Sequence, residues 1–285
     1  MSVSKQVASF SMRDALYEEP GPKTRRRIRI GTGVAAIAVA ALLGLVVYQF
    51  WATGQLDPRY WVFFTWPSTW SFLLAGLEGT LKVSITAGAI ALVLGLALML
   101  GRISGIRPLA ALCRVVTDFF RGVPSLLLIY FFFLVIPQYG IKMPAFWMIA
   151  LPVALAASGV LAEVLRAGVQ AVPRGQTEAA LALGMRPFRV TLRIVLPQAI
   201  RYVIPSLISQ LVVVVKDTTV AYVVSYPDML QNARVLITNY DALVSTYLVI
   251  AVIYILLNFA INQLSVYVSR RTGVQVVDRL ATDPS

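Results

Sequence analysis

The sequence contains several apolar runs that are too long for the core of a water-soluble domain. The first, Ile30 to Trp51, carries no charged residue. At about 1.5 Å per residue it can cross the ~30 Å hydrocarbon layer of a bilayer. Hydrophobic residues make up 58% of the chain and charged residues 13%, whereas soluble domains average about 45–50% and about 25%. Because so few charges cannot cover a water-exposed surface, the sequence predicts an all-α membrane protein.

We expect six transmembrane helices. They cover residues 29–51, 72–100, 109–136, 143–165, 197–215 and 243–268. Gly122-Val123-Pro124 interrupts the third run. Since proline removes a backbone donor and clashes with the preceding turn, this helix should kink or break there. The first run has a cleaved signal peptide as its alternative, but about 20 apolar residues exceed the ~7–15 of a signal peptide's apolar region.

The positive charges predict which helix ends face the cytoplasm. The chain has 25 Lys and Arg against 13 Asp and Glu, a net charge of +12. Most of these cations lie in residues 1–29, 102–114, 166–201 and 270–279, at alternate helix junctions, which is the positive-inside pattern. This distribution explains the charge better than nucleic-acid binding does. It predicts a multi-pass protein of the cell membrane with both termini in the cytoplasm.

These boundaries predict five parts. They are a cytoplasmic basic tail at 1–28, an N-terminal transmembrane helix at 29–51, an external interfacial segment at 52–71, a transmembrane core at 72–271 with a cytoplasmic loop at 167–196, and a cytoplasmic C-terminal tail at 272–285. The basic tail is expected to be flexible. The segment 52–71 is rich in Trp and Tyr, whose rings prefer the headgroup layer. Residues 216–241 should form a polar external segment with room for a short re-entrant or surface helix.

The residue inventory excludes several kinds of chemistry. The chain has no histidine and a single cysteine, Cys113. No disulfide can form within it, and zinc sites of the His/Cys type, Ser-His-Asp triads and histidine switches are ruled out. The sequence also lacks the Gly-x-x-x-x-Gly-Lys-Ser/Thr loop that cradles nucleotide phosphates. We expect no catalytic residue, no metal ligand and no bound cofactor in this chain.

The cytoplasmic loop carries a specific motif. It reads Glu178-Ala179-Ala180, three residues, Gly184, nine residues, Ile194, one residue, then Leu196-Pro197. The pattern resembles the EAA loop of permease subunits of ATP-binding-cassette (ABC) importers at every motif position and in its spacing. Neither a secondary transporter nor a membrane scaffold, the two rival functions, predicts this spacing.

The resemblance covers about residues 72–268. Further segments resemble the polar amino-acid subgroup of these permeases: Gly76 to Leu81, Asp118 to Pro124, Ala162 to Gly168, Val172 to Gln176, Leu196 to Ala199, and Lys216 to Thr219. The resemblance implies a five-helix permease core, so that the helix at 29–51 is an extra N-terminal span. A leading span of this sort looks like permeases of actinobacterial glutamate-uptake systems.

The resemblance also implies partners and a mechanism. Two ATP-binding-cassette ATPase subunits, a second permease subunit (homologous or identical) and an extracellular substrate-binding protein would complete the importer, with ATP and Mg²⁺ held by the ATPases. Transport would proceed by alternating access. The expected substrate is a polar amino acid, glutamate first, with glutamine, cystine or a basic amino acid as alternatives. Contacts with the ATPase fall to Thr177, Glu178, Ala179, Ala180, Leu181, Leu183 and Gly184.

The residue types suit a short docking helix. Thr177 can cap its first turn and Glu178 favours the positive end of the helix dipole. The two alanines are small enough for another protein to approach closely, and the two leucines supply apolar anchors. Gly184 suits the left-handed residue that ends a helix. Pro197 fits the first turn of the following span, where its missing donor costs nothing.

Ionisable residues near or inside the spans are candidates for the substrate pathway, because a charge in hydrocarbon costs at least ~2.5–3.5 kcal/mol. They are Asp118, Arg121, Glu163, Lys216 and Asp217. An amino acid carries both signs of charge, so a pathway with both signs can meet it. The alternative is that these residues only neutralise one another and fix helix packing.

Overall fold

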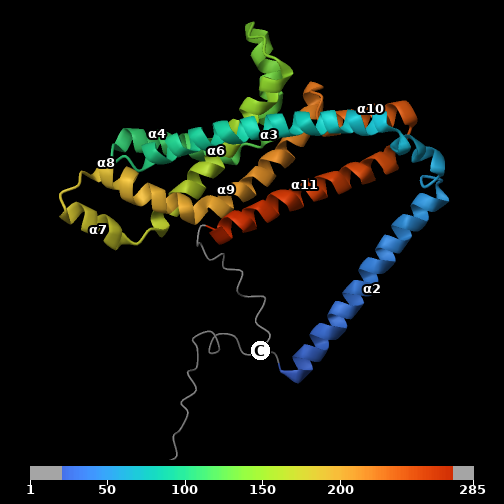
Figure 1. Ribbon diagram of the computed structural model, residues 1–285, viewed down its shortest axis with the longest axis horizontal. Coiled ribbons are helices and arrows are strands. Elements are labelled where there is room, and N and C mark those ends of the chain that lie inside the picture. The colour runs from blue at the N-terminus through green and yellow to red at the C-terminus, as the bar shows by residue number, and fades with distance from the viewer. Residues whose placement is uncertain (1–20, 272–285) are drawn as a thin grey trace, which may run out of the picture. The chain divides into compact units, whose positions relative to one another are not determined.

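A computed structural model describes residues 21–271 (Figure 1). Every regular element in this part of the chain is helical, which confirms the all-α prediction. Five helices are individually long and apolar enough to span a membrane, and residues 107–122 with 125–139 pass the same test as one bent pair. The predicted tail at 272–285, and residues 1–20 of the predicted basic tail, lie outside the described residues.

The chain divides into two compact units, and the first, Met1–Asp57, contains the helix α2, Pro22–Ala52. Proline in the first turn starts this helix favourably, because its φ is already helical and no donor is lost. Arg and Lys are good helix formers. The basic run at 23–29, which we expected to belong largely to a flexible tail, is therefore helical, and α2 begins earlier than residue 29.

The second unit, Pro58–Ser285, holds all the other elements. In order they are the 3₁₀ helices η1 (Pro58–Tyr60) and η2 (Val62–Thr65), α3 (Pro67–Arg102), α4 (Arg107–Gly122), α5 (Ser125–Tyr130), the π-helix η3 (Phe131–Val135), the 3₁₀ helix η4 (Ile136–Tyr139), α6 (Ala145–Ala171), α7 (Arg174–Ala182), α8 (Pro187–Val190), the π-helix η5 (Thr191–Val195), α9 (Leu196–Thr218), the 3₁₀ helix η6 (Thr219–Val224), α10 (Met229–Tyr240) and α11 (Leu243–Arg271).

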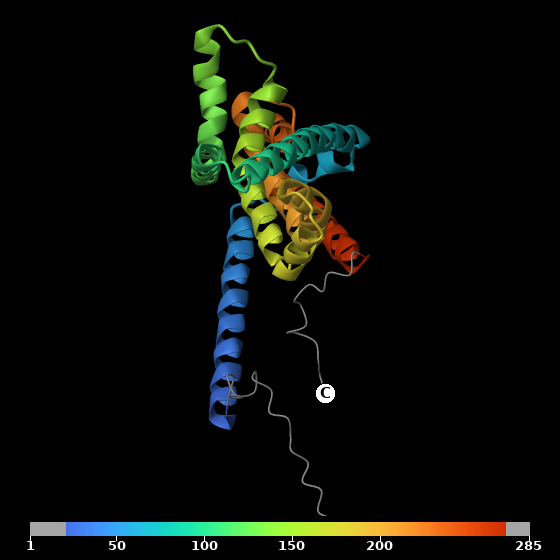
Figure 2. The ribbon, with the colours of Figure 1, turned by 90° about the vertical axis from the view of Figure 1, so that its left-hand side faces the viewer.

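The third predicted span is broken where the sequence indicates. The α4 helix ends at Gly122 and α5 begins at Ser125, with a bend of 96° between the segments 107–122 and 125–139. Val123 has extended backbone angles, φ −87° and ψ 126°, as expected for a residue that precedes proline. Figure 2 shows α5 and its continuation turning steeply away from α4. The predicted break is confirmed.

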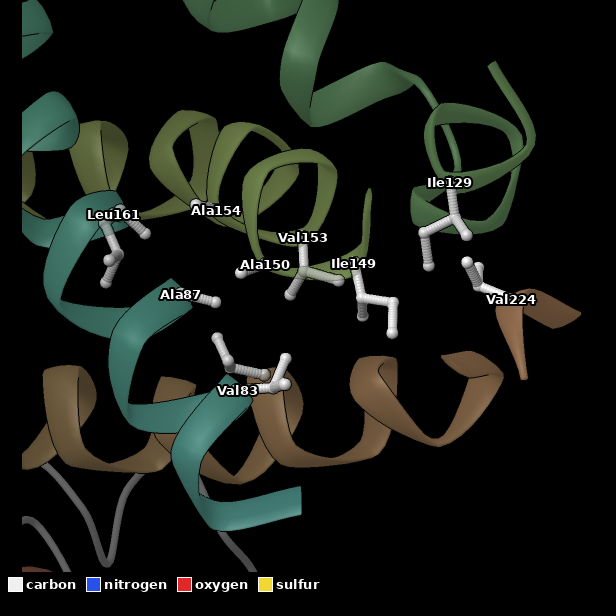
Figure 3. Packing of buried hydrophobic residues seen from close by; sticks show 11 residues of the cluster. Val83, Ala87, Ile129, Ile149, Ala150, Val153, Ala154, Leu161 and Val224 are labelled. Carbon is white, nitrogen blue, oxygen red and sulfur yellow. The ribbon is translucent and has the colours of Figure 1, made fainter. Parts of the chain in front are cut away.

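The α6 helix is the centre of the second unit. It packs against α3, α4, α5 and α9. A buried apolar cluster joins α6 to α3, α5 and α9: Val83 and Ala87 of α3 lie opposite Ile149 and Val153 of α6 (Figure 3). Leu161 extends this cluster toward the loop that follows α6. The bundle is therefore organised around the helix that leads directly into that loop.

The aromatic segment before α3 packs more deeply than a surface segment would. Phe63 is fully buried and stacks on Tyr240 of α10, with 4.6 Å between ring centroids. The indole nitrogen of Trp70 donates to the carbonyl of Phe64 at 2.8 Å, which closes the segment onto the start of α3. This α3 helix begins at Pro67, before the predicted residue 72. The segment thus covers α10 as well as presenting partly exposed tryptophans.

The predicted short helix within residues 216–241 is α10, but its first turn is buried against α3 and is not a surface element. The backbone nitrogen of Met229 donates to the Thr80 hydroxyl at 3.1 Å, and the Asn232 side chain donates to the Phe72 carbonyl at 2.7 Å. Asp228 caps the helix by accepting from the Gln231 nitrogen at 2.7 Å. In Figure 1, α10 lies beside the N-terminal part of α3.

Candidate functional site

The loop after α6, which carries the motif from Glu178 to Pro197, folds into α7, and Gly184 terminates this helix as expected. Its φ is +77°, in the left-handed region that glycine reaches without steric cost. The Met185 nitrogen donates to the Ala180 carbonyl at 3.2 Å and the Gly184 nitrogen donates to the Leu181 carbonyl at 2.9 Å. These two bonds form a Schellman motif, which satisfies the carbonyls at the end of the helix. The predicted C-terminus of α7 is confirmed.

The predicted N-terminus of α7 is wrong. The helix begins at Arg174, with Pro173 at the capping position and no side-chain cap. Thr177 therefore lies inside the helix, and Glu178 lies beyond the first turn. The reason is Pro173, whose fixed φ starts the helix without a capping side chain. A threonine followed by an acidic residue is also compatible with a helix interior, so this pattern gave a wrong first residue for α7.

One face of α7 packs on its own chain. Ala180 is only 5% exposed. It lies in a buried apolar cluster with Val172, Val190, Val195 and Ala199. We expected its small side chain to admit another protein, but it admits the helices of its own chain instead. This contact attaches α7 to the residues that follow α6 and to the start of α9.

Other side chains of α7 and of its C-cap present exposed apolar surface. Leu183 is 83% exposed and Leu181 is 43% exposed, and both Glu178 and Ala179 are exposed. Phe188 of α8 adds a ring that is 70% exposed. Sequence analysis missed Phe188, although an aromatic residue directly after Pro187 in a basic loop is an available signal. A helix anchored by Ala180 and displaying leucine side chains can dock into a complementary groove.

A cavity of about 460 Å³ lies beside α7. Thr177 and Leu181 line it from α7, Val169 from the end of α6, and Ile103 from the residue after α3. Val172 and Val190 of the Ala180 cluster line the same cavity.

The continuous helical segment from α8 to α9 contains a π-turn immediately before Pro197. Proline cannot donate a backbone hydrogen bond, and the π-helix at 191–195 accommodates the gap. The Gln198 side-chain nitrogen donates to the Ile194 carbonyl at 2.8 Å. Pro197 lies in the first turn of α9, as expected, so the loop motif ends in a helix of defined direction.

Glu163 of α6 joins three helices through arginine side chains. Arg102 of α3 donates from Nη1 to Glu163 Oε1. Arg166, one turn along α6, lies with Nη2 at 2.8 Å from Oε2. Arg121 of α4 has Nη1 at 3.8 Å from Oε1. The sequence analysis named Glu163 and Arg121, but Arg102 is 61 residues from Glu163 in the chain, and only the fold shows that it takes part. We call this group the Glu163 cluster.

Arg121 is the most accessible member of the Glu163 cluster. Its Nη2 lies 3.4 Å from Asp118 Oδ1 on the same helix face, and both side chains are about half exposed. The pair expected from the i,i+3 spacing is therefore present. Because its distances to Glu163 and Asp118 are long for ion pairs, Arg121 keeps donors that another anion can reach.

Lys216 and Asp217 lie apart from the Glu163 cluster, at the end of α9. Asp217 is partly buried, with Ser125 of α5 nearby. Lys216 is exposed. The five pathway candidates thus form two groups and not one. Nowhere in residues 21–271 do three or more His, Cys, Asp or Glu side chains gather as a metal site would require.

The sequence is similar to those of known membrane transport proteins. Residues 95–274 match the family model described as a binding-protein-dependent transport system inner membrane component. The glutamate transport system permease protein GluD of Corynebacterium glutamicum is 39% identical over 226 residues, which cover 76% of this chain and 81% of that one. The glutamate/aspartate import permease protein GltK of Escherichia coli O6:H1 is 32% identical over 217 residues, 71% of this chain and 94% of that one.

The fold also has a solved counterpart. A crystal structure of an amino acid ABC transporter with histidines is similar with a TM-score of 0.69 and 29% sequence identity. The similar region covers 73% of this chain and 98% of that one.

Proposed function

Because the chain belongs to the family of binding-protein-dependent transport system inner membrane components, we propose that it is the permease subunit of an ATP-driven importer for a polar amino acid. The observation that carries the proposal is α7: Ala180 attaches it to the bundle, while Leu181 and the C-cap residue Leu183 remain exposed. This geometry is what a docking helix for a separate ATPase needs.

Glutamate is the substrate we propose first. Two relatives similar over more than two thirds of this chain are described as glutamate or glutamate/aspartate permeases. Glutamine, cystine or a basic amino acid is the alternative; a relative from Bacillus subtilis is described as an arginine permease. An extracellular binding protein would deliver the substrate and set much of its selectivity.

The proposed mechanism is alternating access. Two ATP-binding-cassette ATPase subunits, which hold ATP and Mg²⁺, would each dock on an α7 helix, one from this chain and one from a second permease subunit, homologous or identical. Closure of the ATPases would draw the α7 helices together, and α6 and α9 would follow because both adjoin the Ala180 cluster. The partner ATPase subunits would hydrolyse ATP, and the helices of this chain would respond by moving as rigid bodies.

The proposed topology has six spans in the cell membrane. It counts residues 107–139 as one bent span, places both termini in the cytoplasm, and places α7 on the same side. Coupling falls to Thr177, Glu178, Ala179, Leu181, Leu183 and Gly184, with Ala180 as the anchor. On the pathway we propose Asp118 and Arg121, which are half exposed, together with Lys216 and Asp217 at the end of α9 and Glu163 at the inner end of α6.

Uptake by the reconstituted complex tests this function. Proteoliposomes would hold this chain, its partner permease and the ATPase, with the binding protein outside, and labelled glutamate uptake would be measured. We expect uptake only with ATP and binding protein, and none when the ATPase cannot hydrolyse ATP. Uptake driven by an ion gradient in vesicles without the ATPase would refute the importer function. ATP-dependent uptake of another amino acid alone would refute only the choice of glutamate.

A further inference from the structure

The two carboxylate oxygens of Glu163 have different partners. Oε2 pairs with Arg166 on the same helix, at 2.8 Å, and this contact fixes the rotamer of Glu163. Oε1 accepts from Arg102 of α3 and lies 3.8 Å from Arg121 of α4. One oxygen therefore orients the side chain, and the other connects α6 to two neighbouring helices.

The positions of these arginines matter as much as their charge. Arg102 is the last residue of α3, and Arg121 lies in the last turn of α4, directly before the break at residues 123–124. Glu163 lies two turns before the end of α6, and α7 begins three residues after that end. The Glu163 cluster thus connects α6, which leads into α7, to the ends of α3 and α4. The apolar cluster around Ala180 contains no residue of α3 or α4.

Close packing holds these helices together without a directional bond between them: Gly95 of α3 lies against the backbone of α6, and Gly159 of α6 lies against the backbone of α4. Met99 and Leu165 pack together at the same level and hold α3 against α6, but apolar burial has no directional preference. Hydrogen bonds between guanidinium and carboxylate are directional and strong where water is scarce. The side chains of Arg102 and Glu163 are each only 17% exposed, so this contact is the sheltered, directional one at the α3–α6 interface.

We propose that Glu163 is a positioning residue that transmits the movement of α7 and α6 to α3 and α4, by holding Arg102 and Arg121 in register with α6. This inference rests on the proposed function, since it concerns the coupling of ATP hydrolysis to transport. When α6 moves with the docked loop, α3 moves with it through Arg102, and the end of α4 follows through Arg121. Without the contact, the sheltered directional bond between α3 and α6 is missing, and less of the movement of α6 reaches α3.

The test separates coupling from folding. In the reconstituted complex, glutamate uptake and ATP hydrolysis are measured together, and the quantity compared is the amount transported per ATP. The variants are R102Q, E163Q, the double variant R102Q/E163Q, and R102K. Removing Glu163 alone leaves the sheltered Arg102 unpaired, whereas in the double variant only Arg166 and Arg121, which are 29% and 50% exposed, lose a partner. The double variant therefore keeps assembly while losing the contact.

A matched control exists on α3. Glu78 and Lys82 form an ion pair at 2.6 Å, but their side chains are 63% and 65% exposed. The E78Q variant removes a glutamate carboxylate from an ion pair with an ammonium group that lies within one helix and connects no two helices. We expect its transport per ATP to equal that of the wild type.

In the double variant we expect assembly and ATP hydrolysis to persist while transport per ATP falls on the order of tenfold. R102K keeps the charge and should recover a large part of that loss, which a purely space-filling role would not predict. Wild-type transport per ATP in the double variant would overturn the proposal, and so would an equal loss in E78Q. A wild-type complex that takes up no amino acid would instead contradict the proposed function.

Discussion

Replacing Gly159 with valine should separate α4 from α6. A Cβ atom at this position would lie 2.8 Å from the Arg121 nitrogen, 2.8 Å from the Thr117 carbonyl oxygen and 3.2 Å from the Phe120 carbonyl carbon. All three atoms belong to the backbone of α4, so no side chain can rotate away. The α4 helix itself must move by about 0.6 Å to restore ordinary contact distances, and valine adds two further methyl groups beyond the Cβ.

The expected cost follows from overpacking of this kind, about 1–3 kcal/mol in the free energy of unfolding. The assay is thermal unfolding of the purified complex, in which about 1 kcal/mol corresponds to a shift of about 2–4 °C. G122V is the matched control, because Gly122 ends α4 and nothing lies within 4 Å of a Cβ built there; it should change stability by less than about 0.5 kcal/mol. Equal unfolding temperatures for G159V and G122V would refute the close packing of α4 on α6.

Two further predictions concern α7 and α10. A180D buries a charge in the apolar cluster of Val172 and Val195 and should release α7, so that the ATPase no longer co-purifies. A182D, at an exposed position of the same helix, should still co-purify with the ATPase. Equal retention of the ATPase by both variants would contradict the docked arrangement. Burial raises the pKa of the Asp228 carboxyl from 3.8 to about 6. Because the folded chain then holds this proton more tightly than the unfolded chain, the free energy of unfolding should fall by roughly 3 kcal/mol as pH rises from about 4 through about 6. D228N keeps an N-cap oxygen and should remove this contribution in unfolding measured across that range; an unchanged pH slope would contradict the burial of an ionisable carboxyl.

The sequence predicted what local chemistry determines. Pro124 interrupts the third span because proline lacks a backbone donor, whatever surrounds it in the fold. Gly184 ends α7 because few other residues adopt φ +77°. The length of each apolar run likewise predicted the spans, because it too is a local property of the sequence. These features depend on a few neighbouring residues, so no knowledge of the fold was needed to find them.

Features that depend on distant contacts could not be predicted. Arg102 reads as one of several cytoplasmic arginines, and only the packing of α3 on α6 brings it to Glu163. Ala180 reads as a surface alanine until α7 lies on the start of α9. The segment around Asp228 is polar in sequence, yet Thr80 of α3 binds its backbone and buries it. In each case a partner far along the chain determines the role.

The most direct measurement of the central claim is site-specific cross-linking at Leu183. Cys113 is the sole native cysteine and is buried, so L183C in a C113S background offers one reactive thiol on the exposed face of α7. In membranes containing the whole complex, a short cross-linker should join L183C to the ATPase, and L112C, an exposed apolar position on α4, should give no such product. Capture of the ATPase at both positions, or at neither, would contradict α7 as the element through which ATP hydrolysis drives transport.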